Sequence, residues 1–89
     1  MLRLTVISQT REEGVLKVEG WVSGEDVVLL EEEGTRLLGE TKRLVLDLKD
    51  TRFIDRAGIA LLRRWQGNGL VLRGASLFVR TVLEKRGLL

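Results

Sequence analysis

The spacing of apolar residues along this chain alternates between a period of two and a period of three to four, and this alternation constrains the fold most. Four stretches have the apolar character or alternation of strands, at residues 2–8, 15–22, 43–50 and 70–74. Three stretches have helical spacing, at residues 23–38, 56–66 and 76–87. The expected order is β-β-α-β-α-β-α. This order predicts an α/β fold in which three helices lie on one side of a mixed, mostly parallel, four-stranded sheet.

The length of the chain limits it to one domain. Its 89 residues suffice for a single hydrophobic core, so we expect one domain over residues 1–89. No apolar run approaches the ~20 residues that span a bilayer, and the N-terminus lacks the long apolar stretch of a signal peptide. Since cysteine is also absent, these features favour a cytoplasmic protein with no direct membrane insertion.

The side-chain inventory narrows the chemistry. The chain has no histidine, cysteine or tyrosine and only three serines. A Ser-His or Cys-His nucleophile is therefore excluded, and so is a zinc site built on imidazole or thiolate ligands. The sequence also contains neither a P-loop nor a Gly-x-Gly-x-x-Gly pattern. We therefore predict a protein that is not an enzyme and holds no metal or cofactor.

Charge is divided unevenly along the chain. Residues 1–50 carry seven Lys/Arg and eleven Asp/Glu, whereas residues 51–89 carry eight Lys/Arg and two Asp/Glu. A basic half can attract an acidic protein, a nucleic acid or an anionic membrane surface, but it is equally typical of a solvated helix surface. Nucleic acid is disfavoured because only four aromatic residues are present, and we expect two of them, Phe53 and Phe78, to be buried.

The stretch "FIDRAGIALLRRW" places an aspartate between an apolar run and a predicted helix. The carboxylate of Asp55 is expected to cap this helix by accepting the backbone N–H of Ala57 or Gly58. Glycine early in a helix lowers its propensity, so Gly58 indicates that something approaches the backbone closely. On these grounds alone, Asp55 is a structural helix cap.

Similar reasoning gives expectations for the other elements. Ser23 is predicted to cap the first helix, with Asp26 as the acid of a capping box. Gly34 in that helix suggests close packing, and the spacing of Trp65 places it in the core. Strand parity groups Trp21 with polar neighbours, which predicts an outward aromatic side chain suited to an interface.

The corner sequence "LVLDLKDTRFIDRAGIALL" resembles the signature of the STAS domain, as found in bacterial anti-sigma factor antagonists. That signature is an apolar strand ending in Asp-Leu, a short loop, and an apolar-Asp-Ser-Ser-Gly-Leu motif that opens a helix. Three further stretches are similar to family motifs, namely "VEGWVSGEDV", "LVLRGAS" and "VRTVLEKRGL". Together they cover essentially the whole chain, in the element order predicted from periodicity.

This resemblance implies a small, non-enzymatic protein that binds other proteins. In the sigma-factor branch the partner is a kinase-type anti-sigma factor, and phosphorylation of the second serine after the aspartate ends the binding. Here Ala57 occupies the phosphoacceptor position and Arg56 replaces the preceding serine, so that site cannot be phosphorylated. Ser23 replaces a second family aspartate, which makes the expected surface less negative. Thr51 and Ser23 remain open as alternative phosphoacceptors.

The resemblance also implies where partners bind. The expected contact residues surround the corner and are Trp21, Ser23, Asp55, Arg56, Ala57, Gly58 and Leu61. Short STAS proteins resembling this one also serve as accessory subunits of bacterial lipid-transport ABC complexes, which is the alternative function. Family members often continue with a further strand and helix, so we also expect an uncovered sheet edge that offers a site for homodimerisation.

Overall fold

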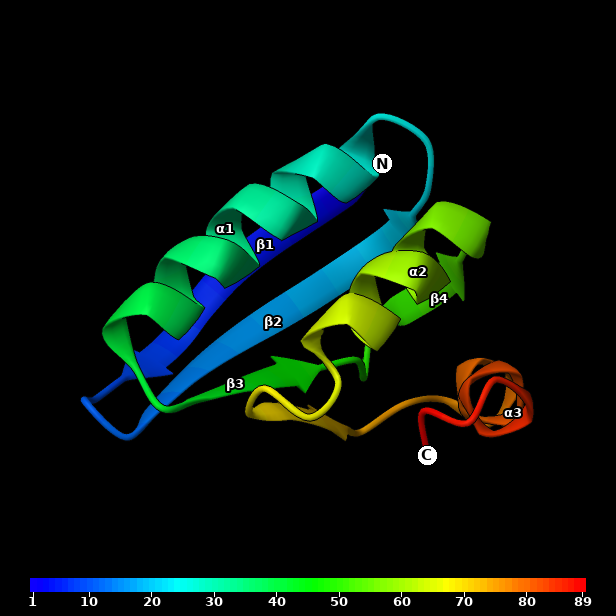
Figure 1. Ribbon diagram of the computed structural model, residues 1–89. Coiled ribbons are helices and arrows are strands. Elements are labelled where there is room, and N and C mark those ends of the chain that lie inside the picture. Colours follow the sequence, from blue (N-terminus) through cyan, green and yellow to red (C-terminus); the bar gives the residue numbers. More distant parts are fainter.

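The computed structural model describes residues 1–89 as a mixed sheet with three helices (Figure 1). The five strands are β1 (Leu2–Gln9), β2 (Glu13–Val22), β3 (Arg43–Asp47), β4 (Thr51–Ile54) and β5 (Leu70–Arg73). The three helices are α1 (Asp26–Glu40), α2 (Arg56–Trp65) and α3 (Leu77–Lys85). The predicted α/β fold with three helices is therefore confirmed. None of the helices has the length and apolar character needed to span a membrane.

The sheet has five strands where the sequence predicted four. Residues 43–50 were expected to form one strand, but β3 ends at Asp47 and a turn leads into the additional strand β4. The Thr51 hydroxyl donates a 2.6 Å hydrogen bond to the carbonyl of Val18, and Gly20 N–H donates to the carbonyl of Asp50. These contacts align β4 beside β2, and they involve residues distant in sequence.

Strand β2 is the centre of the sheet. The strand order is β1-β2-β3-β5, and β4 pairs with β2 beyond the end of β3. β1 runs antiparallel to β2, whereas the β2–β3, β2–β4 and β3–β5 pairs are parallel. The predicted mixed, mostly parallel sheet is therefore confirmed. The ten residues of β2 connect the end of the molecule near β3 with the end near β4.

The hydrophobic core lies between the sheet and the helices. Helices α1 and α2 cover the same face of the sheet (Figure 1), and 16 buried apolar residues form one cluster. Trp65 lies in this core, where its ring occupies the space that a side chain on Gly34 would need. The expectations of a buried Trp65 and of close packing at Gly34 are both confirmed.

Two aromatic residues differ from expectation. Phe78 was predicted to be buried, but 59% of its surface is exposed. Phe78 lies in the first turn of α3, and the buried face of that helix is formed by Val79 and Leu83 instead. Phe53 is half-buried beside Trp21 rather than fully enclosed.

Candidate functional site

Asp55 joins two helices at the predicted corner. One carboxylate oxygen accepts the backbone N–H of Gly58 at 2.8 Å, which caps α2 as the sequence predicted. The other oxygen accepts the backbone N–H of Gly24 at 2.9 Å, in the loop that leads into α1. A carboxylate is acceptor-only, so both oxygens are suited to these two donors. Asp55 therefore fixes the start of α2 against the start of α1.

The first helix begins differently from the prediction. Ser23 was expected to cap it, but α1 starts at Asp26, and the capping position is Glu25, whose side chain makes no cap hydrogen bond. The backbone carbonyl of Ser23 accepts the N–H of Asp26 instead. Gly24 adopts a φ of 58°, a region in which glycine is unstrained, and it turns the chain between them. The Ser23 side chain is half-buried beside the Asp55 corner.

Helix α2 presents only part of the predicted contact set. Arg56 and Ala57 are exposed in its first turn, and Ala60 continues this outer face one turn later. Leu61 is 0% exposed and Gly58 is buried, so the expectation that both would contact a partner on this surface is wrong. The helical spacing explains the burial, because both residues lie on the same stripe as Trp65.

The close approach predicted at Gly58 is made by the protein itself. A Cβ atom at this position would lie 2.7 Å from Ile54 Cγ2 and 2.9 Å from Val22 Cγ1. Real Cβ atoms do not come this close to carbon atoms, so α2 packs on the ends of β2 and β4 because residue 58 has no side chain. The absence of a side chain at Gly58 thus allows α2 to lie close to the sheet.

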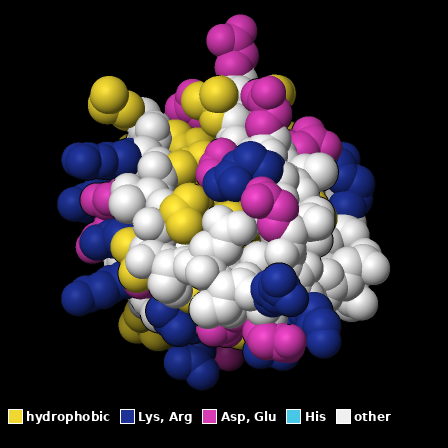
Figure 2. Space-filling model, turned by 90° about the vertical axis from the view of Figure 1, so that its left-hand side faces the viewer, with side chains coloured by type: hydrophobic (Ala, Val, Ile, Leu, Met, Phe, Trp, Pro, Cys, Tyr) yellow, Lys and Arg dark blue, Asp and Glu magenta, His cyan; other side chains and the backbone are white.

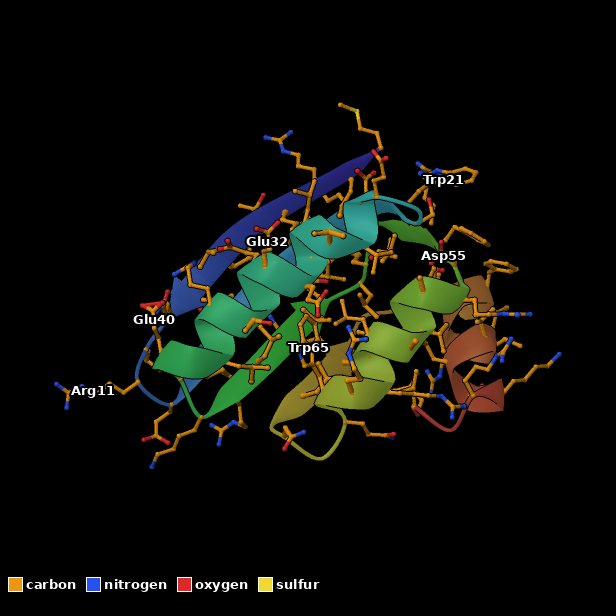
Figure 3. All side chains as sticks on the ribbon, turned by 45° about the horizontal axis from the view of Figure 1, so that its top comes forward. Arg11, Trp21, Glu32, Glu40, Asp55 and Trp65 are labelled. Atoms are coloured by element: carbon orange, nitrogen blue, oxygen red, sulfur yellow. The ribbon has the colours of Figure 1, made fainter.

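An aromatic pair lies at the same end of the molecule. Trp21 is 52% exposed, and its ring centroid lies 5.6 Å from that of Phe53 with the planes tilted by 51°. Figure 3 shows Trp21 and Asp55 at this end, with Trp65 in the interior. The outward direction predicted for Trp21 is therefore observed. Aromatic side chains of this kind are enriched in protein–protein interfaces.

The two candidate hydroxyls differ in their surroundings. Thr51 is 2% exposed, and its hydroxyl is used in the hydrogen bond to Val18. Ser23 is half-buried next to the corner. A kinase needs an accessible hydroxyl, so Thr51 is poorly suited as a phosphoacceptor in the folded protein.

An ion pair lies at the turn between β3 and β4. Lys17 on β2 lies 3.1 Å from Asp50, which precedes β4. The hydrogen bond and charge of Asp50 raise the pKa of Lys17 above its ordinary value. This pair helps to hold the turn between β3 and β4. No group of three or more Asp and Glu side chains lies close enough together to hold a metal ion.

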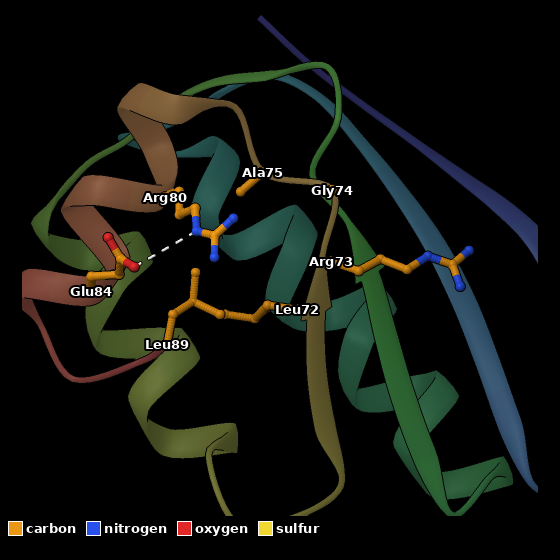
Figure 4. Close-up of a pocket in the computed structure, with 7 residues that line it drawn as sticks. All are labelled: Leu72, Arg73, Gly74, Ala75, Arg80, Glu84 and Leu89. Atoms are coloured by element: carbon orange, nitrogen blue, oxygen red, sulfur yellow. Dashed lines mark ion pairs between the residues drawn. The ribbon is translucent and has the colours of Figure 1, made fainter.

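A surface hollow of about 420 Å³ lies away from the corner, between β5 and α3 (Figure 4). Arg80 and Glu84 form an ion pair of 3.6 Å at its rim, while the side chain of Arg73 points away from it. The full lining is Leu72, Arg73, Gly74, Ala75, Arg80, Glu84 and Leu89. None of the contact residues predicted from the sequence lines this hollow.

The structure adds two residues to the corner that sequence reasoning did not select. Gly24 provides the N–H that Asp55 binds, and its position directly after Ser23 in a Ser-Gly pair was the available signal of a turn. Val28 is 54% exposed in the first turns of α1, near the same end. The available signal was helical spacing, because Val28 lies off the stripe of Val27, Leu30 and Leu37 that faces the core.

Comparisons with known proteins support the same family from sequence and from fold. Residues 5–88 match the family described as "Mlab, STAS domain". No curated protein sequence is significantly similar to this chain. Among solved structures, the unphosphorylated form of the anti-sigma factor antagonist SpoIIAA has a TM-score of 0.78 at 19% identity, covering 99% of this chain and 82% of that one.

Two further structures agree with this comparison. The phosphorylated form of SpoIIAA, a Bacillus cell fate determinant, has a TM-score of 0.72 at 19% identity and covers 99% of this chain and 85% of that one. An anti-sigma factor antagonist STAS domain from Rhodobacter sphaeroides has a TM-score of 0.62 at 19% identity, covering 85% and 92%. At this identity the structures establish the fold, and the sequence match establishes the family. The chain belongs to the STAS domain family.

Proposed function

We propose that this protein is a non-enzymatic interaction module of the partner-switch type, which binds a kinase-type anti-sigma factor through the Asp55 corner. One observation carries the proposal. Ala57, at the family's phosphoacceptor position, is exposed in the first turn of a helix whose start Asp55 fixes with two hydrogen bonds. The likeness of the fold to SpoIIAA, an anti-sigma factor antagonist, supports the same class of partner.

The exposed face of α2 has the properties of a contact surface. Ala57 and Ala60 are small, so a partner can approach the helix backbone closely. Arg56 is exposed on the same helix and supplies donors for an acidic partner, whereas the guanidinium of Arg63 already donates to the carbonyl of Arg86. Trp21, at the same end of the molecule, is a candidate anchor because exposed tryptophans often dominate binding energy.

We further propose that binding is not ended by phosphorylation at the usual position. Ala57 has no hydroxyl, so the charge of about −2 that phosphate adds cannot arise there. Incubation with a partner kinase and ATP, followed by intact-mass measurement, is expected to show no phosphate-sized increase. A mass increase that disappears in Ser23→Ala would instead identify Ser23 as the acceptor.

The binding surface is tested by a charge at its centre. Ala57→Glu places a carboxylate in the first turn of α2, where the helix dipole tolerates an acid, so the domain should remain folded. We expect it to weaken partner binding at least five-fold, as is typical for a residue at the centre of an interface. Gly39→Glu is the matched control, because Gly39 is exposed on α1 with open space around it.

The measurement is capture from extract followed by titration of the purified partner. Wild type and Gly39→Glu should capture the same partner protein, and Ala57→Glu should lose it while its circular dichroism spectrum stays unchanged. Equal affinity of all three proteins would remove the corner from the binding surface.

A second candidate function is that of an accessory subunit of a lipid-transport ABC complex. Two observations favour keeping it, namely the alanine at position 57 and a family description that carries the name Mlab. The same capture experiment separates the candidates. An ATPase–permease complex retained by wild type would support this function, whereas a kinase-like protein would support the first.

A further inference from the structure

We propose that two copies of this chain pair through the free edge of β1, with a two-fold axis passing through Leu4. β1 is the outermost strand of the sheet, and its only partner is β2. Figure 3 shows it along the outer border of the molecule, with α1 set back towards the interior. Unpaired edge strands of this kind are templates for pairing with another chain.

The backbone groups that point outward can be assigned from the pairing with β2. Trp21 N–H donates to the carbonyl of Met1, which makes these two residues a hydrogen-bonded pair of the antiparallel ladder. Such pairs alternate with pairs whose N–H and C=O groups point to the opposite side. Leu2, Leu4 and Val6 therefore direct their backbone groups towards the free edge.

Little on this edge opposes pairing. Proline is absent from the chain, and Arg3 is the one charged residue of β1. The register shifts between Val6 and Ser8, and the extra residue there disturbs the strand beyond Val6. The regular part of the edge is therefore confined to residues 2–6.

Residues 2–6 match themselves in one antiparallel register. With the axis through Leu4, Leu4 faces its own copy and Leu2 faces Val6, while Arg3 faces Thr5. The pairs formed by Leu2, Leu4 and Val6 are apolar, and no charged residue meets its copy. An axis through Arg3 would place two guanidinium groups opposite each other, which is unfavourable. An axis through Thr5 would require Ser8, which lies beyond the irregularity.

The side chains of this edge form a surface that such a dimer would cover. A groove between β1 and α1 is lined by Leu2, Leu4, Leu29, Glu32 and Glu33. Leu29 is 51% exposed and Val6 is 38% exposed. Figure 2, which faces this side, shows hydrophobic side chains to the left of and above its centre, with acidic groups and a basic group beside them. Pairing two copies would join their apolar strips.

The glutamates that line the groove, Glu32 and Glu33, make the strength of dimerisation depend on salt concentration. Glu32 is exposed beside the groove, and the two-fold axis brings the Glu32 side chains of both copies to the same side of the paired strands. Like charges repel less when salt screens them. Association should therefore become stronger as salt is raised. A basic peptide docking on the same edge would show the opposite dependence.

The register is tested by cysteine cross-linking, because the chain has no cysteine of its own. Leu4→Cys places two sulfurs on the axis, where facing Cα atoms of a hydrogen-bonded pair are about 5.5 Å apart, within disulfide range. Leu2→Cys or Val6→Cys alone puts the two cysteines about 14 Å apart along the strands. A mixture of Leu2→Cys and Val6→Cys brings unlike residues face to face.

The expected result is disulfide dimer from Leu4→Cys and from the mixture, but not from Leu2→Cys or Val6→Cys alone. Sedimentation equilibrium of the wild type should show the mass rising from that of the 10.1 kDa chain towards twice that value as concentration increases. Val6→Lys should return the protein to monomer, with the unfolding midpoint that the wild type has at concentrations where the wild type is itself monomeric. A wild type that stays monomeric from micromolar to millimolar concentration, or equal cross-linking of all variants, would overturn the proposal.

Discussion

Replacing Asp55 by alanine should destabilise the domain more than the loss of an ordinary helix cap. The carboxylate accepts two backbone N–H groups, from Gly58 in α2 and from Gly24 before α1, at 2.8 and 2.9 Å. Loss of a capping side chain costs about 1 kcal/mol. A second hydrogen bond to a charged group adds about 1 kcal/mol or more. We therefore expect Asp55→Ala to lower the free energy of unfolding by about 2 kcal/mol.

Asp55→Asn separates the two hydrogen bonds. The amide retains one oxygen, which can still cap Gly58, but its NH₂ group cannot accept the N–H of Gly24. The expected loss of unfolding free energy is about 1 kcal/mol, half of that for alanine. Ser76→Ala is the control for a single cap, since Ser76 accepts only the Val79 N–H, at 3.4 Å.

Urea unfolding followed by circular dichroism measures these differences, with the dependence on urea concentration expected to be unchanged. For a domain of this size, a loss of about 2 kcal/mol corresponds to a fall of roughly 8–16 °C in Tm. Hydrogen exchange should show faster exchange of both the Gly24 and Gly58 amides in Asp55→Ala. If Asp55→Ala were no less stable than Ser76→Ala, the double-acceptor role would be refuted.

Two further predictions concern packing and charge. Gly34→Ala should lower the free energy of unfolding by about 1–3 kcal/mol, because the added methyl group would collide with the Trp65 ring. Gly39 lies in the same helix with open space around it, so Gly39→Ala should raise the free energy of unfolding by about 0.5–1 kcal/mol. The urea concentration at the midpoint of unfolding checks both variants. The same shift of this midpoint in Gly34→Ala and Gly39→Ala would contradict the packing assigned to Gly34. Asp50 raises the pKa of Lys17, so the stability that this pair contributes should be fully present below the unfolded lysine pKa of about 10.4 and be lost as pH rises through the higher folded value. The free energy of unfolding of Asp50→Asn should therefore lie below that of the wild type by the same amount between pH 7 and 9.5, and by a smaller amount above pH 10.5. A difference in unfolding free energy that stays constant above pH 10.5 would exclude the contribution of the ion pair.

Features carried by local spacing were predictable from the sequence. The aspartate between a strand and a helix predicted the Asp55 cap, and strand parity predicted the outward Trp21. Gly34 and Trp65 were assigned to close packing from helical spacing, and both lie in contact. In each case the signal resides in a few neighbouring residues, which is why sequence alone sufficed.

Features that depend on distant contacts were not predictable. β4 has only four residues, and the hydrogen bond that places it joins Thr51 to Val18, 33 positions earlier. Leu61 was assigned to a contact face from the family resemblance, although its helical spacing with Trp65 indicates the core, where it lies. The second oxygen of Asp55 binds Gly24, 31 positions earlier, which no local pattern indicates.

The central position of β2 has a mechanical consequence. This strand is hydrogen-bonded to β1 along one side and to β3 and β4 in succession along the other. A pull applied at the Asp55 corner along the direction of β2 would load these hydrogen bonds in shear, many at a time, instead of opening them one after another. Tension at the corner would thus be distributed to the far end of the domain, where Gly14 pairs with Leu44.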